Sequence, residues 1–417
     1  MPFPFRVRWL LLIPALVQMA SGEADFWDMA PLRYSDTKSQ DSIAKLAADL
    51  ASGARKLDGV RGLERLRFVL RELNVPEESQ ALVFSKTSHQ NHLIHPKNPR
   101  ALYFSTEAYV GYVPGGAIEL IVEDPALGPV FYVIDDDDAG KPGVQRDTNL
   151  CMSCHGTTRT EGVPGMLVRS VFPNPDGHPL LAKGTTHVTH ETPIPERWGG
   201  YYITGRSSLP HLGNFTYDEQ DESDNKPRMS ELADLREKID VSKYLRPTSD
   251  IVALMVLEHQ CQMHNLMNAA SMQYRRSHYL AKAIDPNGDP DQGSAGRVAD
   301  GMAERIVAWM FFKDEAELGD GVEGNEEFQK AFTARFPRTA RGDSLADFQL
   351  YDRLFKNRCS YMIYSKTFRE LPPRVKSAVI AKMKAALAGE DPGFDWLKES
   401  ERKRISAILE ETLEGWK

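Results

Sequence analysis

The segment Cys151-Met152-Ser153-Cys154-His155 places two thiols three positions apart, with an imidazole directly after the second thiol. This Cys-x-x-Cys-His spacing is the attachment pattern of a c-type haem. The two intervening residues let one turn of chain present both sulfurs to the same porphyrin edge, where they form thioethers with the vinyl groups. The next side chain then lies beneath the ring. The motif predicts one covalent haem c on Cys151 and Cys154, with His155 as the proximal iron ligand.

A Cys-x-x-Cys pair also occurs in dithiol redox sites and in zinc sites, but in different surroundings. A thioredoxin-like pair belongs to a βαβ context, which the residues around this pair do not show. A zinc site needs a second cysteine pair or a histidine pair at zinc-finger spacing. The sequence has neither after His155, so haem attachment is the favoured interpretation.

The ligand on the other side of the iron separates two classes of function. A distal Met or His favours electron transfer, whereas an open position permits small-molecule chemistry. The sequence offers these distal candidates: His211, His190, His259, His264 and Met166. Because His259 and His264 are five residues apart on a predicted helix, their side chains point about 140° apart and cannot both face one iron. Core packing is the alternative role for each candidate, and a Met so close to the motif is well suited to fill a gap beneath the haem loop.

The N-terminus has the order of a secretory signal peptide. Arg6 and Arg8 precede the apolar run 9–17, and small residues follow at 20–22. We expect residues 1–22 to be cleaved, although an uncleaved anchor is the alternative. The mature chain would then function in the periplasm or another extracytoplasmic compartment, where c-type haem is attached. No later apolar run approaches the roughly 20 residues of a membrane helix, so no transmembrane anchor is expected in the mature chain.

The predicted fold class is α+β and predominantly α-helical. Residues 23–140 are expected to form N-terminal helices followed by an antiparallel β-meander of short, aromatic and β-branched strands between 81 and 134. Residues 141–227 are expected to form a loop-rich haem-attachment region. Residues 228–417 are expected to form a helical C-terminal lobe, whose first long helix begins near Ile251 after the N-cap signal of Asp250. Further helices are predicted at 298–313, 325–335, 343–365, 373–388 and 399–413.

Composition limits the partners and the covalent scaffold. The chain carries 51 Lys and Arg against 59 Asp and Glu, a net charge of −8, which argues against a nucleic-acid partner. Its 4 cysteines are too few for a disulfide-built fold. Outside the motif, Cys261 and Cys359 form either a disulfide or two buried free thiols, and both alternatives remain open. The oligomeric state is also open.

Several stretches together resemble a family of exported, single-haem, cytochrome c-type proteins from planctomycete-like and other environmental bacteria. The stretches that carry the resemblance are 83–88, 98–104, 109–112, 151–155, 162–165, 196–200, 250–264 and 359–361. The resemblance implies haem binding and electron transfer, and it implies no substrate. The chain departs from the family pattern at Met166, where His is frequent, and at Leu212, where Met is frequent. These departures weaken Met166 as a ligand and keep His211 as a candidate.

The leading functional hypothesis is an extracytoplasmic c-type cytochrome that exchanges single electrons with redox partner proteins. The alternatives are a haem-dependent oxidoreductase of a peroxidase-like kind, or a haem-based sensor or binding module, each with an open distal site. In the enzyme, His190, His211, His259 or Glu258 would act in proton transfer. The size of the chain indicates further roles, because a minimal electron carrier needs only roughly 100 residues.

Overall fold

The computed structural model describes residues 25–57, 59–136, 140–220 and 225–417. The predicted signal peptide, 1–22, lies outside these residues. The fold is a mixed α+β fold, with 38% helix and 16% strand, so the expectation of a predominantly helical chain is wrong.

Helices and strands occur throughout the described residues. The helices are α1 (Ser42–Ser52), α2 (Gly62–Glu72), α3 (Met152–His155), α4 (Ile251–Ile284), α5 (Ser294–Met310), α6 (Glu326–Thr333), α7 (Lys366–Arg369), α8 (Pro373–Ala388) and α9 (Glu399–Thr412). The strands are β1 (Ala81–Val83), β2 (Arg100–Phe104), β3 (Ala108–Tyr112), β4 (Ile118–Asp124), β5 (Gly128–Asp136), β6 (Pro142–Asp147), β7 (Arg169–Val171), β8 (Thr185–His187), β9 (Tyr201–Tyr202), β10 (Gly205–Ser207), β11 (Glu231–Leu232) and β12 (Val322–Glu323).

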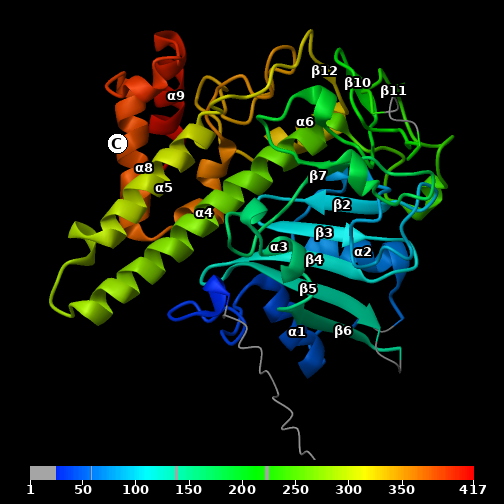
Figure 1. Cartoon of the computed structure of the whole chain (residues 1–417), viewed down its shortest axis with the longest axis horizontal. Coiled ribbons are helices and arrows are strands. Elements are labelled where there is room, and N and C mark those ends of the chain that lie inside the picture. The colour runs from blue at the N-terminus through cyan, green and yellow to red at the C-terminus, as the bar shows by residue number, and fades with distance from the viewer. Residues whose placement is uncertain (1–24, 58, 137–139, 221–224) are drawn as a thin grey trace, which may run out of the picture.

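A 7-stranded antiparallel sheet organises the N-terminal half, in the order β6-β5-β4-β3-β2-β1-β9. The predicted meander is confirmed as β1 to β5. β6 and β9 come from the segment expected to be loop-rich, so this segment contributes to the sheet as well as to loops. In Figure 1, α3 lies in front of this sheet and α2 lies behind it.

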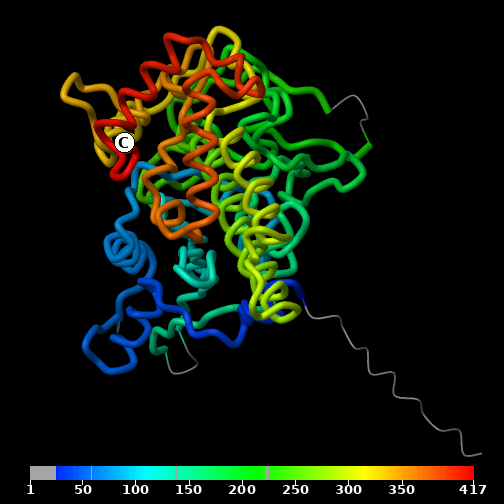
Figure 2. The backbone as a smooth tube through the Cα atoms, turned by 90° about the vertical axis from the view of Figure 1, so that its left-hand side faces the viewer, coloured from blue at the N-terminus to red at the C-terminus, as the bar shows by residue number. Residues whose placement is uncertain are grey.

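The C-terminal half is built around α4, which is 34 residues long. It begins as predicted, because the Asp250 side chain accepts a hydrogen bond from the Ala253 N–H at 2.8 Å. Figure 2 shows α4 and α5 running side by side, with the C-terminal helices α8 and α9 packed beyond them. Among the described residues, no helix is both long enough and apolar enough to span a bilayer.

The helix expected at 343–365 does not form, which accounts for part of the difference in fold class. Only the 3₁₀ turn Tyr361–Tyr364 is helical there. Phe348 and Phe355 pair instead across an antiparallel bridge, and Asp347 accepts a hydrogen bond from the Ser344 N–H at 2.9 Å. Ser and Asp side chains that bind nearby backbone groups favour turns over helix. The segment therefore folds as turns and a short bridge instead of the predicted helix.

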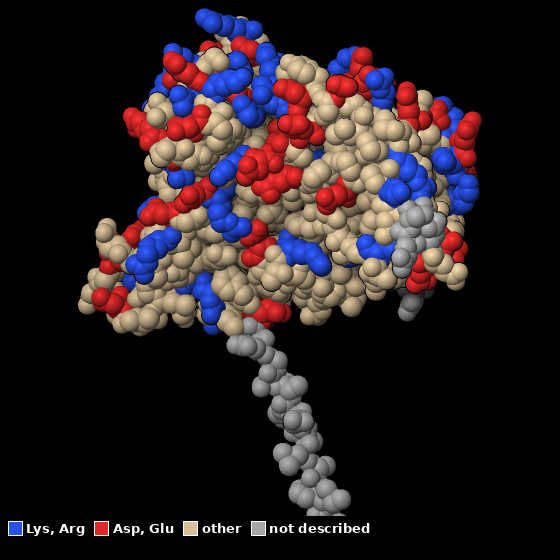
Figure 3. Space-filling view, turned by 45° about the horizontal axis from the view of Figure 1, so that its top comes forward, with Lys and Arg blue, Asp and Glu red and all other residues tan. Residues whose placement is uncertain are grey.

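The face of the molecule shown in Figure 3 carries Lys and Arg interspersed with Asp and Glu. The structured core is continuous from the sheet to α4 and the C-terminal helices. Neither the charges on this face nor the core marks a functional site. The candidate site therefore rests on the local geometry around the short helix α3.

Candidate functional site

α3 is a single helical turn that presents the Cys-x-x-Cys-His residues together. The N–H groups of His155 and Gly156 bond to the carbonyls of Cys151 and Met152, both at 2.9 Å, which closes the turn. The Asp147 carboxylate accepts from the Cys151 N–H at 3.0 Å and fixes the start of the turn. The Cys151 thiol is half-buried, and the Cys154 thiol is exposed. Burial, with the Asp147 charge, raises the pKa of Cys151 to about 12, so this thiol is protonated at neutral pH.

His155 is held as a neutral imidazole with its Nε2 available. Its Nδ1 lies 2.8 Å from the carbonyl oxygen of Gly165, and only an N–H can satisfy that contact. Burial lowers the pKa of His155 to about 4. The proton therefore sits on Nδ1, and within the described chain no residue hydrogen-bonds Nε2. This is the tautomer that a metal-ligating histidine adopts when its second nitrogen is fixed by a carbonyl.

The loop that fixes His155 is clamped to α4 by Asn265. The Asn265 side chain accepts from the Met166 N–H and donates to the Met166 carbonyl, both at 2.8 Å. A Cβ on Gly165 would lie 2.4 Å from Asn265 Oδ1, so only glycine allows this approach. The orientation of the imidazole thus depends on α4, which begins about a hundred residues later in the chain. The chain between them is long enough to bring the two together.

Replacing Asn265 with Ala is expected to destabilise the protein by about 1–3 kcal/mol for each Met166 backbone group left buried without a partner. Urea unfolding followed by circular dichroism measures the change in the free energy of unfolding. Asn287, which is exposed in the α4–α5 connection, provides the control, and its replacement by Ala is expected to change stability by less than about 0.5 kcal/mol. Equal stabilities of the two variants would show that the clamp is energetically unimportant.

A cavity of about 540 Å³ lies against α3, and both motif thiols and His155 belong to its wall. One face of the sheet forms another wall, because the paired positions Leu102, Gly111 and Glu119, and the paired positions Tyr109, Ile121 and Phe131, are cross-strand neighbours. The remaining wall comes from Met166–Arg169, from the 178–181 loop and from Leu257 and Cys261 of α4. Segments from both halves of the chain therefore enclose the space in front of His155.

The residues of this cavity fit a haem. Its volume is within the roughly 300–1,000 Å³ of ligand pockets. Aromatic and aliphatic side chains suit the faces of a macrocycle, while Lys86, Arg100 and Arg169 can pair with its carboxylates. The Arg100 guanidinium lies over Gly111 and pairs with Glu119 at 2.5 Å, but its Nε is buried without a hydrogen-bond partner. In the described chain, no three His, Cys, Asp or Glu side chains converge to bind a metal ion by themselves.

Met166 is the one distal candidate that the structure brings to the cavity. It directly follows Gly165, whose carbonyl holds the Nδ1 of His155. Because Nδ1 and Nε2 point to opposite sides of an imidazole, Met166 belongs to the proximal wall. Its side chain is 2% exposed, which agrees with the gap-filling role that a Met takes in a core.

His190 and His259 lie together in the core, away from the cavity. Their Nδ1 atoms are 2.9 Å apart, and both rings pack on Phe312. The Nε2 of His259 contacts the Ser360 hydroxyl at 2.7 Å. Burial lowers the pKa of His190 to about 3 and that of His259 well below its ordinary value, so both are neutral. Neither ring lines the cavity, and the prediction that one of them is a distal ligand gains nothing from this placement.

His211 and His264 are also outside the cavity wall. His211 packs edge-on against Trp198, and its Nδ1 accepts from the Gly213 N–H at 3.1 Å. His264 lies one residue behind the wall, because its Nδ1 is 2.7 Å from the hydroxyl of Tyr109, which does line the cavity.

Several cavity residues were not predicted from the sequence. His89 is exposed and contributes to the cavity wall, and its Nε2 contacts the Leu150 carbonyl at 2.8 Å. His178 is also exposed at the mouth. Strand alternation could have placed Tyr109 and Glu119 on one face of the sheet. No local sequence pattern indicates which loop residues line the cavity.

The thiols outside the motif are both free and buried, so the structure contains no Cys261–Cys359 disulfide. Cys261 lines the cavity from α4, whereas Cys359 packs in the C-terminal core. Burial raises the pKa of both thiols far above the ordinary value, which keeps them protonated.

The segment 196–200 has a structural role that the sequence did not reveal. Arg197 and Glu258 form a buried ion pair at 2.8 Å, with side chains 2% and 0% exposed. Trp198 donates its ring N–H to the same carboxylate at 2.7 Å. Burial raises the pKa of Glu258 to about 7 despite the arginine. The segment thus anchors the loop region to α4, and Glu258 is not in contact with the cavity.

No family model, curated protein or solved structure matches this chain. What the site can do therefore follows from its own residues. These are two thiols on one helical turn, a neutral imidazole with an available Nε2, and an apolar cavity in front of all three.

Proposed function

We propose that this protein is an extracytoplasmic c-type cytochrome that carries one covalent haem c and transfers single electrons between redox partner proteins. The observation that carries the proposal is the cavity of about 540 Å³ with Cys151, Cys154 and His155 in one wall. A Cys-x-x-Cys-His motif placed on a convex surface would have no room for a macrocycle. Here the motif borders a space of suitable size and apolar character.

The motif residues, the basic side chains and the aromatic side chains of the cavity each have a part in this function. Cys151 and Cys154 would hold a haem through thioethers, and His155 would bind its iron through Nε2 while the Gly165 carbonyl keeps the proton on Nδ1. A bound haem supplies a reversible one-electron couple. Lys86, Arg100 and Arg169 pair with carboxylates, and the aromatic walls exclude water.

A redox partner would approach at the cavity mouth. Cys154 is exposed there. Leu181 of the cavity wall is 81% exposed, and Leu150, which directly precedes Cys151 and lines a neighbouring pocket, is 64% exposed. Exposed apolar side chains next to a redox centre provide a small contact surface of the kind used in transient electron-transfer complexes.

A second candidate function is a haem-dependent oxidoreductase or sensor with an open distal position. The observation that favours it is the placement of the distal candidates. His190, His211, His259 and His264 do not line the cavity, and Met166 lies on the His155 side. Optical spectra of the purified protein separate the two functions. A low-spin haem unchanged by carbon monoxide or cyanide supports the electron carrier, whereas a high-spin haem that binds them supports the enzyme or sensor.

Replacing His155 with Ala is expected to remove the normal low-spin spectrum, because the proximal nitrogen is lost while both thiols remain. Expression must include haem-maturation machinery, and the measurements are the absorption spectrum and the intact mass. His89→Ala is the matched control, since His89 is at the cavity mouth but makes no bond to the α3 turn residues 151–155. An unaltered spectrum in the His155 variant would refute the proximal assignment.

A further inference from the structure

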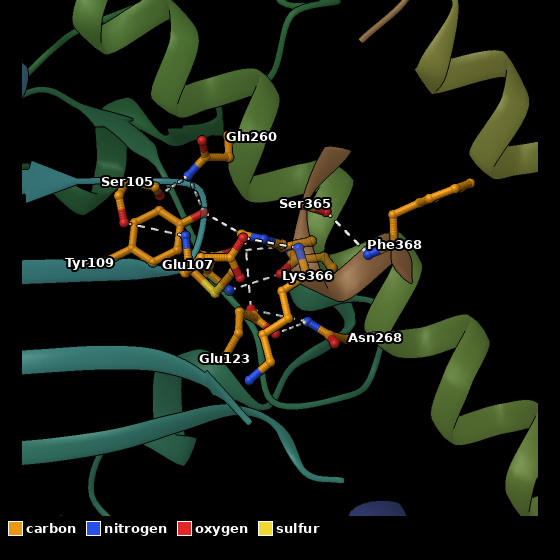
Figure 4. A network of polar contacts seen from close by, with 12 residues as sticks. Ser105, Glu107, Tyr109, Glu123, Gln260, Asn268, Ser365, Lys366 and Phe368 are labelled. Atoms are coloured by element: carbon orange, nitrogen blue, oxygen red, sulfur yellow. Dashed lines mark hydrogen bonds and ion pairs between the residues drawn. The ribbon is translucent and has the colours of Figure 1, made fainter. Parts of the chain in front are cut away.

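A second group of titratable side chains lies behind the cavity, where the sheet meets α4 and α7. Figure 4 shows Tyr109, Glu107 and Glu123 converging there with Gln260 and Asn268. Asn268 donates to both oxygens of Glu123, at 3.3 and 3.2 Å. Glu107 and Glu123 are on adjacent segments, since the Glu123 N–H donates to the Glu107 carbonyl at 3.1 Å.

Hydrogen bonds connect this group to the cavity. Gln260 donates to the Tyr109 hydroxyl oxygen at 2.9 Å, so the Tyr109 O–H is free to donate to His264 Nδ1 at 2.7 Å. The same nitrogen is 3.8 Å from Glu123 Oε1. Because Tyr109 lines the cavity, these contacts form a path from the cavity through Tyr109 and His264 to the Glu123 carboxyl.

The opposite side of Glu123 faces a small crevice. Its volume is about 20 Å³, and its wall includes Thr367, Arg275 and the exposed Glu370. A site of roughly 10–15 Å³ holds one water molecule when polar partners surround it. A water molecule can therefore exchange protons between Glu123 and solvent without any opening of the fold.

Several polar atoms of this group have no hydrogen-bond partner within the described chain. They are His264 Nε2, Glu107 Oε2 and Thr367 Oγ1, all buried. Orphan buried atoms of this kind are rare and costly in folded proteins. Thr367 lines the crevice, so a water molecule there would supply a partner for its hydroxyl.

The local charges keep Glu123 close to its titration point. Burial, assisted by the neighbouring Glu107, raises the pKa of Glu123 to about 8, while the Asn268 hydrogen bonds and the Lys366 charge oppose the rise. Burial lowers the pKa of His264 to about 3, so His264 is neutral. The charged or titratable groups that face Glu123 or share the crevice with it are Glu107 from the β2–β3 turn, Tyr109 from β3, Asp124 from β4, His264 and Arg275 from α4, and Lys366 and Glu370 from α7 and its end. Arg369 acts on the neighbouring Glu107.

We propose that Glu123 takes up one proton from the crevice when one electron enters the cavity, and that Tyr109 and His264 link the two events. This inference rests on the haem function proposed above. The electron comes from a redox partner protein, and the proton comes from crevice water. An O–H bond forms on the Glu123 carboxylate, so the cavity and the carboxyl together gain no net charge. Oxidation releases both. The added negative charge favours the protonated carboxyl because little water screens the intervening residues.

The test is the pH dependence of the midpoint potential of the holoprotein, measured by spectroelectrochemistry from about pH 6 to about pH 10. In the wild type, the potential is expected to fall as the pH rises around 8, because reduction is then accompanied by proton uptake. The steepest possible slope, for one proton taken up per electron, is about 59 mV per pH unit. Glu123→Gln is expected to remove the slope. Glu315→Gln is expected to keep it, since Glu315 is a carboxyl of similarly raised pKa, about 7, outside both the cavity and the crevice.

A measurement on the cofactor-free chain distinguishes failure of this inference from failure of the proposed function. Infrared difference spectra of the cofactor-free chain are expected to show a protonated carboxyl that titrates near pH 8 and is missing in Glu123→Gln. Tyr109→Phe should retain this carboxyl but flatten the slope of the holoprotein. A pH-independent potential in a protein that carries covalent haem overturns this inference alone. A slope that survives Glu123→Gln does the same, whereas a chain without covalent haem overturns the proposed function as well.

Discussion

Replacement of both Cys151 and Cys154 by Ala is expected to abolish covalent haem attachment completely. In the proposed function each thiol would supply one thioether, and the one-turn helix α3 brings both to the same cavity wall. No other described residue of the wall except Cys261 carries a thiol. The measurement is intact mass after expression with haem-maturation machinery, together with haem staining of the denatured protein. The wild type should show the mass of one macrocycle, and the double variant should show none.

The matched control replaces Cys261 and Cys359 by Ala. Cys261 lines the same cavity but lies on α4, away from the turn that carries His155. This control is expected to retain the full added mass. If the double variant of Cys151 and Cys154 still carried a covalent macrocycle, or if the wild type carried none, the haem proposal would be wrong. Single replacements should each leave one thioether.

Replacing Arg197 with Met is expected to destabilise the fold by about 3–5 kcal/mol, because the Glu258 carboxylate would remain buried without its cation. The guanidinium also donates to the carbonyls of Thr192 and His190, at 2.6 and 3.0 Å, so two backbone acceptors lose their partner. The loss should appear as a lower urea midpoint with an unchanged slope. The remaining Glu258 would bind a proton more tightly still, since burial already raises its pKa to about 7.

Two comparisons make this prediction specific to the buried pair. The exposed pair Arg374–Asp300 has side chains 30% and 63% exposed, and Arg374→Met is expected to cost only about 0–1 kcal/mol. Replacing Arg197 and Glu258 together by Met should recover part of the stability, because an apolar pair leaves no charge in the core. Similar losses in Arg197→Met and Arg374→Met would contradict the proposed anchoring role.

Features set by neighbouring residues were predictable from the sequence. Asp250 caps α4 because a side chain needs only the next few backbone N–H groups to do so. The strands of the meander alternate and are separated by Pro-Gly and Asp-Pro turns, which are local signals as well. The Cys-x-x-Cys-His motif belongs to the same class, since its geometry is contained in one helical turn.

Features that depend on distant partners were not predictable. The sequence could not show that Tyr109 from β3 meets His264 from α4, because no local pattern encodes a contact between the two. The same holds for the ion pair between Arg197 and Glu258, which joins the segment 196–200 to α4. The five distal candidates were chosen by residue type, and the tertiary structure left only Met166 in the cavity wall. The helix predicted at 343–365 is wrong because Phe348 pairs with Phe355 across a bridge, and the sequence did not indicate that pairing.

The composite cavity also bears on how the proposed cofactor would be loaded after export. The sheet wall and the thiol-bearing turn precede Leu257 and Cys261 in the chain, and these two residues complete the wall from α4. Asn265, also on α4, holds the loop behind His155. If the exported chain receives its haem before α4 docks, a maturation enzyme would meet both sulfurs at the edge of an open trough.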